Sequence, residues 1–175
     1  SNVVVAEDCE ADDVLDMFGA VCVVNGMESH SGSNAMRALV APKNQDGSFF
    51  SAVKVSGAHD ASLEMIRRGE ADVAAIDCVT YALLEAYRPA ALDGIRKLGR
   101  TYHAPAIPYI TRWNDDTDKI ERLQAGIFNA FADPHLTATR QSLYLKDIET
   151  LPVSAYQRIL ELEDYAESLG YSHLR

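Results

Sequence analysis

The sequence predicts an α/β fold in which a mostly parallel sheet is flanked by helices. Three times an apolar, strand-like run is followed by a segment with helical spacing, and the runs are Val21 to Asn25, Phe49 to Val55 and Ala71 to Ile76. Parallel neighbours need crossover connections, and a helix after each strand supplies one. Because ligands in such sheets bind outside the carboxyl ends of the strands, a site is expected at those three ends.

The composition is that of a globular protein with one domain or two small lobes. Of the 175 residues 47% are hydrophobic, which is enough for a core. The net charge of -10, from 26 acidic and 16 basic residues, leaves no broad basic surface and argues against nucleic acid as a partner. A small anion can still bind, because a few oriented amides act locally while charges more than about 10 Å away are screened at ordinary salt.

The three cysteines match no metal or redox motif. Cys9, Cys22 and Cys78 are odd in number and fit neither a zinc spacing nor a CxxC pair. Cys22 lies in an apolar strand and Cys78 near a helix start, so buried free thiols are expected at both. No apolar run approaches the roughly 20 residues that span a bilayer, and the first residues contain no secretion signal.

A short strand precedes the first strand-helix unit. This strand is expected at Val3 to Ala6, and Val14 to Phe18 can form one or two helical turns. After the strand that ends at Asn25, a helix is expected from about Ser33 to Val40, because Pro42 cannot continue it.

The next two units have clear boundaries. The helix that opens at Ser56 to His59 ends at Arg68, whose charge suits the negative end of the helix dipole, and Gly69 supplies the left-handed stop. Asp77 ends the third strand, and a helix follows to about Tyr87.

The chain changes character after these units. Ile95 to Arg100 and Ala106 to Thr111 are expected as extended segments that leave the first lobe, since Pro105 and Pro108 exclude helix locally. Beyond Asn114 the pattern is helical. Helical spacing relates Ile120, Leu123, Ile127 and Phe131, and also Ile159, Leu162, Ala166 and Leu169, with Pro134 and Pro152 marking helix starts.

A cluster of small polar residues follows the first of the three strands. Ser31, Gly32, Ser33 and Asn34 stand where the chain turns into a helix, so backbone N–H groups and hydroxyls can converge on an anion. Gly32 lets the backbone approach a ligand closely. The alternative is a helix cap with nothing bound.

His59 and Asp77 stand at the other two strand ends. His59 lies near a helix N-terminus, where the dipole disfavours protonation and a neutral imidazole can donate one hydrogen bond. A surface or cap histidine is the alternative. Asp77 ends an apolar run, where an unpaired carboxylate is costly to bury, so it either caps the next helix or accepts from a ligand hydroxyl or ammonium.

Sequence patterns typical of catalysis are missing. There is no GxSxG, GxxxxGK[ST] or HExxH motif and no pair of histidines at metal spacing. Serine, histidine and aspartate are present, but a triad needs them oriented on one another, and serines at a helix cap favour binding. We therefore expect no catalytic residue, no metal and no cofactor.

Four segments together resemble one protein family. They are VVNGMESHSGSNAM, FFSAVKVSGAHDASLEMIRRGEADVAAIDCVTYALL, LGRTYHAPAIPYIT and LPVSAYQRILELEDYAESLGY. The first is similar to an anion loop, the second to an S-G-x-H-x-x-S helix followed by a G-E-A-D-V-A-A-I-D strand, and the third to a proline-rich crossing strand. These patterns, in this order and spacing, are those of the phosphate, phosphite and phosphonate group of ABC-transporter solute-binding proteins. The fourth is also typical of that group.

The resemblance implies a type II periplasmic-binding-protein fold whose two lobes close on a ligand. By that resemblance Ser31 to Asn34 hold the oxyanion, His59 reaches it from the next helix, and Asp77 contacts another ligand substituent. The implied function is to deliver a small oxyanion to a membrane permease outside the cytoplasm, as in the periplasm, without enzymatic activity. A lyase or synthase on the same fold, or a sensory ligand-binding module, is the alternative.

The chain departs from the family pattern in two places. Full-length members have a first-lobe segment before the strand at Val3 to Ala6, so we expect a truncated two-lobed protein with an incomplete site in isolation, able to compensate as a homodimer. The expected organisation is an α/β ligand-binding lobe at residues 7–94, with crossing strands and a helical remainder at residues 1–6 and 95–175. Gly26-Met27-Glu28 replaces a common Asp-Pro-Asp turn, which leaves the anion unspecified.

Overall fold

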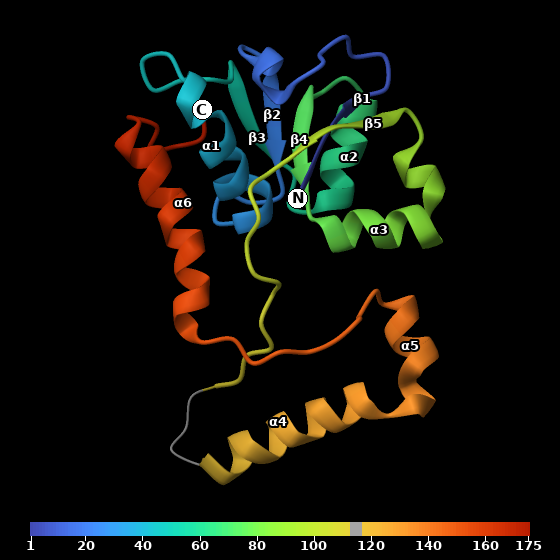
Figure 1. Cartoon of the computed structure of the whole chain (residues 1–175). Helices are drawn as coiled ribbons and strands as arrows, with labels where there is room; N and C mark the ends of the chain where they lie inside the picture. Colours follow the sequence, from blue (N-terminus) through green and yellow to red (C-terminus); the bar gives the residue numbers. More distant parts are fainter. Residues whose placement is uncertain (113–116) are drawn as a thin grey trace. The chain divides into compact units, whose positions relative to one another are not determined.

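A computed structural model describes residues 1–112 and 117–175, which form two units (Figure 1). Unit 1 comprises Ser1–Ala104 and Tyr156–Arg175, and unit 2 comprises Pro105–Ala155. In the described part of the chain, no helix combines the length and the apolar character that a membrane crossing requires.

Unit 1 is built on a five-stranded sheet with helices on both faces. The strands are β1 (Asn2–Ala6), β2 (Val21–Val24), β3 (Ala52–Val55), β4 (Val73–Ile76) and β5 (Ile95–Arg100). The α-helices are α1 (Ala35–Val40), α2 (His59–Arg67), α3 (Cys78–Tyr87) and α6 (Gln157–Ser168). Short 3-10 turns lie at Val14–Met17, Ala41–Lys43 and Pro89–Leu92, and a π-helical turn lies at His30–Asn34.

The sheet has the strand order β3-β2-β4-β1-β5. β2 pairs in parallel with both β3 and β4, whereas β1 is antiparallel to β4 and to β5. β5 therefore runs in the same direction as β4, and only β1 is reversed. This confirms the predicted α/β fold with a mostly parallel sheet flanked by helices.

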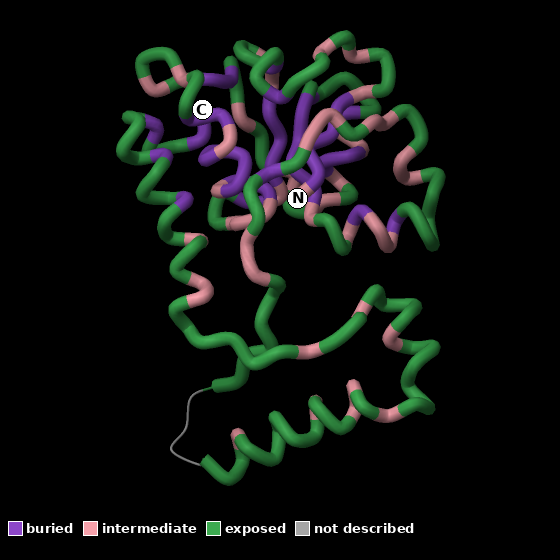
Figure 2. The backbone as a smooth tube through the Cα atoms, viewed as in Figure 1, coloured by how far each residue is buried: buried purple, intermediate pink, exposed green. Residues whose placement is uncertain are grey.

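The strands of unit 1 are largely buried (Figure 2). Their alternate side chains fill a core on each face of the sheet, as the period of two requires. On one face α1 and the C-terminal segment cover Val3, Val5, Cys22, Val24, Val73 and Ala75. On the other face α2 and α3 cover Val4, Val23, Ala74 and Ile76. Packing on both faces therefore fixes the strands whose carboxyl ends carry the predicted site residues.

The C-terminal segment explains why β3 is shorter than predicted. The carbonyl oxygen of Arg175 accepts hydrogen bonds from the backbone N–H groups of Phe49 (2.7 Å) and Phe50 (3.1 Å), and both phenylalanines are buried. The predicted strand at Phe49 to Val55 therefore begins only at Ala52, because its first residues bind the chain terminus.

Unit 2 has helices but no buried residue in its described part. It contains α4 (Thr117–Ala132), a 3-10 turn at Pro134–Leu136 and α5 (Thr137–Ser142); a further 3-10 turn at Val153–Tyr156 leads into α6. The helical spacing predicted from Ile120 to Phe131 is confirmed by α4. Pro134 begins a 3-10 turn and Pro152 directly precedes one, as predicted. The expected start of the helical region at Asn114 lies outside the described residues.

The strand expected at Ala106 to Thr111 is not formed. Residues 101–112 contain neither helix nor strand, and the side chains of Ile107 and Ile110 are 83% and 88% exposed. Proline excludes helix at 105 and 108, as predicted, but a strand also needs a pairing partner, and no described strand pairs with this segment.

Unit 1 includes more of the chain than the ligand-binding lobe predicted at residues 7–94. β1 and β5 form hydrogen-bonded ladders within its sheet, and Leu162 and Ala166 of α6 are buried in it. The functional division between residues 7–94 and residues 1–6 with 95–175 stays a prediction.

The thiol of Cys22 is fully buried, and burial raises its pKa to about 12, as suits an inert core residue. The expectation of a buried thiol at Cys78 is wrong. Cys78 and Val79, in the first turn of α3, are exposed, and the burial of this helix begins only at Tyr81.

Two leucine-to-alanine substitutions test where the core lies. Leu63 of α2 is 1% exposed, so Leu63→Ala should lower the free energy of unfolding by about 2–5 kcal/mol. Leu123 of α4 is 45% exposed, so the matched Leu123→Ala substitution should change it by about 0.5 kcal/mol or less. Urea denaturation followed by circular dichroism measures both values, and equal losses would contradict this description of the core.

Candidate functional site

Three strand ends meet at one edge of the sheet, as the sequence predicts. β2 lies between β3 and β4 and runs parallel to both, so Asn25, Ser56 and Asp77 follow neighbouring strands at the same edge. The N–H of Ser56 donates to the carbonyl oxygen of Val24 at 2.9 Å, which joins two of the ends directly.

The loop after β2 is folded around Ser29. The Ser29 hydroxyl accepts a hydrogen bond from the N–H of Gly32 at 3.1 Å, and its carbonyl oxygen accepts from the N–H groups of Ser33 and Asn34 at 3.0 Å each. The N–H groups of His30 and Ser31 have no partner in the described part of the chain. They are the unpaired donors that a helical N-terminus offers to an anion.

Ser31 connects this loop to α2. Its hydroxyl lies 3.1 Å from Nε2 of His59, the first residue of α2, and 3.4 Å from the hydroxyl of Ser29. The start of α2 is held in turn by the hydroxyl of Ser62, which lies 2.7 Å from that of Ser56. His59 thus lies beside Ser31, although the two residues are 28 positions apart in the sequence.

His59 is held as a neutral imidazole. Burial lowers the pKa of its ring, and the nearby carboxylates of Asp77 and Asp60 only partly oppose that effect. Burial also lowers the pKa of His30. A neutral imidazole has one donor and one acceptor, so Nε2 either donates a hydrogen bond to the Ser31 hydroxyl or accepts one from it, according to the tautomer.

Asp77 caps α3. Its Oδ1 accepts hydrogen bonds from the N–H groups of Val79 (3.0 Å) and Thr80 (2.9 Å) and from the Thr80 hydroxyl (3.3 Å). The capping role that the sequence suggests is therefore confirmed. Its contact with a ligand stays a prediction, and Oδ2 makes no hydrogen bond with the rest of the described chain.

Asn34 is already engaged elsewhere. Its Nδ2 donates to the carbonyl oxygen of Ile159 in α6 at 3.3 Å and lies 3.3 Å from Nδ1 of His30, while Oδ1 accepts from Arg37 at 3.0 Å. Arg37, which is buried, also binds the carbonyl oxygen of Ser172 and lies 3.5 Å from the carboxylate of Glu163. This network fastens the loop to the C-terminal segment.

Ser33 and Gly32 are buried, but they differ in what they can offer. The hydroxyl of Ser33 makes no hydrogen bond to the described residues and is not an enclosed atom, so it is free to donate to a ligand. Gly32 has no room for a side chain, because an added Cβ would lie 2.0 Å from Oδ1 of Asn25.

The predicted set of ligand-binding residues leaves out three residues that support the site. Ser29 and Ser62 organise the two loops, and Asn25 packs beneath Gly32. Their positions in the sequence are the available signal: Asn25 ends a strand, Ser29 precedes the helical turn, and Ser62 is the last residue of the S-G-x-H-x-x-S pattern.

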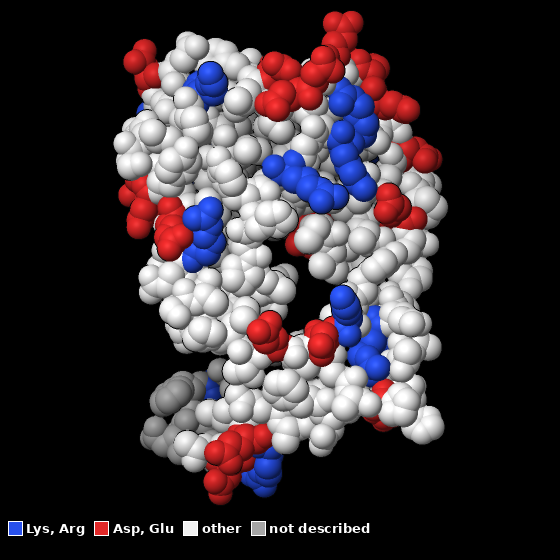
Figure 3. Space-filling view, in the orientation of Figure 1, with Lys and Arg blue, Asp and Glu red and all other residues white. Residues whose placement is uncertain are grey.

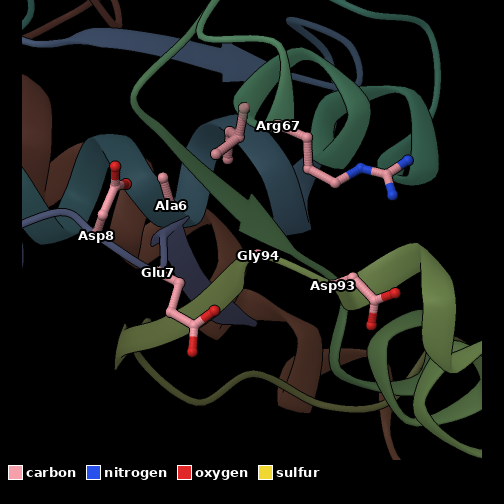
Figure 4. A pocket seen from close by; sticks show the side chains of 7 residues that line it. Ala6, Glu7, Asp8, Arg67, Asp93 and Gly94 are labelled. Carbon is pink, nitrogen blue, oxygen red and sulfur yellow. The ribbon is translucent and has the colours of Figure 1, made fainter.

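A hollow at the opposite edge of the sheet is acidic (Figure 4). It is lined by Glu7, Asp8 and Asp93, while the guanidinium of Arg67 extends away from Glu7 and binds Glu64 and the carbonyl oxygen of Ala90. Figure 3 shows acidic side chains gathered on this part of unit 1. Repulsion by these carboxylates makes the hollow a poor place for an anion.

The site offers neutral donors rather than an acid–base pair or a metal cage. In the part of the chain that the structure describes, no three His, Cys, Asp or Glu side chains are placed to hold a metal ion. Hydroxyls, backbone N–H groups and one neutral imidazole lie together at the β2 and β3 ends, an arrangement that can bind an oxyanion through several hydrogen bonds.

The protonation of His59 can be tested by NMR, from the chemical shift of a C–H proton on its imidazole ring as the pH is lowered. His59 should titrate below the ordinary histidine pKa of about 6.5. The unfolded chain then binds this proton at a higher pH than the folded protein does. The free energy of unfolding should therefore fall as the pH drops below about 6.5. His59→Gln should show a weaker acid dependence of the unfolding free energy, and titration of His59 at or above 6.5 would contradict this environment.

Comparison with known proteins adds independent findings. A family model described as the periplasmic substrate-binding protein of a phosphonate ABC transporter matches residues 1–156. A search of curated proteins finds no match.

Solved structures share the fold at low sequence identity. A binding protein component of an ABC phosphonate transporter from Pseudomonas aeruginosa has a TM-score of 0.78 at 17% identity, over 97% of this chain and 58% of its own. PhnD1 from Prochlorococcus marinus in complex with methylphosphonate has a TM-score of 0.72 at 14% identity, over 97% of this chain and 66% of its own. XAC2383 from Xanthomonas citri, bound to ATP, has a TM-score of 0.72 at 15% identity, over 99% of this chain and 67% of its own. The chain thus spans about two thirds or less of each.

Proposed function

Because the chain belongs to the family of periplasmic substrate-binding proteins of phosphonate ABC transporters, we propose that it binds a small oxyanion and delivers it to a membrane permease. The oxyanion is a phosphonate, phosphite or phosphate. Delivery takes place outside the cytoplasm, where such binding proteins work.

The observation that carries this proposal is the hydrogen bond between Ser31 and His59. It brings the hydroxyl that follows β2 and the imidazole that follows β3 to one point, 3.1 Å apart. Free N–H groups of His30 and Ser31 lie on the same loop. Several donors aimed at one anion contribute about 1.5–3 kcal/mol each, so three or four can give micromolar affinity, about -8 kcal/mol, after the costs of association.

Each predicted residue has a role in this proposal. Ser31 and Ser33 donate hydroxyl hydrogen bonds to the anion, and Gly32 keeps the backbone close to it. Nε2 of His59 donates the single N–H of the neutral ring to the anion in exchange for its bond to Ser31. Asp77 accepts from a protonated oxygen or another substituent of the ligand through Oδ2. Asn34 holds the loop against α6, and its direct contact with the anion is the least supported of the predicted contacts.

A second copy of the chain or a longer chain can supply the opposite wall of the site. Lobe closure around the anion, followed by docking on the permease, is the mechanism that family membership favours. The solved structure of PhnD1 in complex with methylphosphonate supports methylphosphonate as the first ligand to try.

An enzymatic function has less support. A serine-histidine-aspartate triad needs the aspartate to hold Nδ1 of the histidine. Nδ1 of His59 is buried without a hydrogen-bond partner among the described residues, while Asp77 binds the N–H groups of α3 instead. This favours a binding role for Ser31 and His59, because among the described residues no third group orients them for proton transfer.

Isothermal titration with methylphosphonate, phosphite and phosphate tests the proposal. The wild-type protein should bind at least one of them, and Ser31→Ala should weaken that binding by about 10- to 100-fold through loss of one charge-assisted hydrogen bond. Ser48→Ala changes an exposed serine in the loop before β3; it is the matched control and should bind like the wild type. Absence of heat with all three anions, or equal weakening by both substitutions, would refute the proposal.

A further inference from the structure

Two buried polar atoms lack a hydrogen-bond partner among the described residues, and both lie at the carboxyl edge of the sheet. They are Oδ1 of Asn25 and Nδ1 of His59. Asn25 directly follows β2, the strand between the ends that carry His59 and Asp77. The position of Asn25 is therefore the middle one of the three strand ends.

The side-chain amide of Asn25 lies against Gly32. Oδ1 lies so close to Gly32 that a Cβ added there would be 2.0 Å away, and the backbone N of Asn25 would be 3.5 Å away. Nδ2 of the same amide also makes no hydrogen bond with the described chain, yet it is not among the buried unpaired atoms. The amide thus turns its oxygen inward against the loop and leaves its two N–H donors accessible.

A free amide donor in this position needs an acceptor. The loop that packs on Asn25 carries Ser31 and the unpaired N–H groups of His30 and Ser31, all of which are suited to an oxyanion. The nitrogen of an amide lies next to its oxygen, so with Oδ1 against Gly32 the donor also lies beside Gly32. Neutral donation from an asparagine also adds no charge next to Asp77 and the neutral ring of His59.

We propose that Asn25 is a further ligand-binding residue, whose Nδ2 donates a hydrogen bond to an oxygen of the bound oxyanion while Oδ1 remains against Gly32. This inference rests on the proposed function, because it concerns the same anion site. It also assigns Gly32 a second role: the absence of a side chain there leaves space for the Asn25 amide as well as for the ligand.

Two substitutions separate this role from a purely structural one. Asn25→Ala removes the donor and should weaken the binding of methylphosphonate or inorganic phosphate by about 10- to 100-fold, as expected for a charge-assisted hydrogen bond. Asn25→Asp keeps the shape, exchanges the donor for a negative oxygen and should weaken binding further. Gln45→Glu adds the same charge before β3, at the other edge of the sheet, and is the matched control that should bind like the wild type.

The measurements are isothermal titration for the dissociation constant and thermal unfolding for the fold. A structural role alone would lower the melting temperature of the Asn25 variants and leave their dissociation constants within about twofold of the wild type, and that result would overturn the inference. If Asn25→Ala fails to fold, the isosteric Asn25→Asp variant decides.

NMR of the wild-type protein provides a test that needs no substitution. The side-chain NH₂ signals of Asn25 should shift on addition of inorganic phosphate or methylphosphonate, whereas those of Asn44, whose amide is bound to Ala41 and Leu169, should not. Unchanged Asn25 signals in a protein that binds a probe would refute this inference and leave the proposed function standing. A wild-type protein that binds neither probe would refute both.

Discussion

The candidate site depends on one hydrogen bond, between the hydroxyl of Ser31 and Nε2 of His59. It forms because β2 and β3 are parallel neighbours, so the loop after one strand and the helix after the other begin at the same edge of the sheet. Burial lowers the pKa of the imidazole and so favours its neutral form, which forms a neutral hydrogen bond with the hydroxyl. A site of neutral donors suits an oxyanion that must be bound and then released.

The remainder of unit 1 keeps that geometry in place. The two cores fix the positions of the strands, and Asn34 and Arg37 tie the loop after β2 to the C-terminal segment. The chain terminus is bound in turn at Phe49 and Phe50, just before β3. Residues near the C-terminus therefore support the loop after β2, although they lie far from it in the sequence. Unit 2 differs, since none of its described residues is buried and its helices expose apolar side chains such as Leu123 and Phe128.

Patterns local in sequence predicted most of these elements, because strand periodicity, helix stops such as Gly69 and the cap at Asp77 depend on neighbouring residues. The predicted parallel topology then put His59 near Ser31, although the two residues are 28 positions apart in the sequence. Two features could not be predicted: β3 begins later than expected, and Asn34 is bound by α6. Both arise from contacts with residues more than a hundred positions away in the sequence. The unpaired segment at residues 106–111 and the exposed Cys78 likewise depend on which partners are present, and composition carries no such information.

The central claim is that the ends of β2, β3 and β4 form one oxyanion site around Ser31 and His59. A crystal structure of the protein with methylphosphonate tests it most directly. The account predicts density for the phosphonate group within hydrogen-bond distance of the Ser31 hydroxyl and of His59, against the first turn that follows β2. A phosphonate bound only elsewhere on the protein would contradict the account.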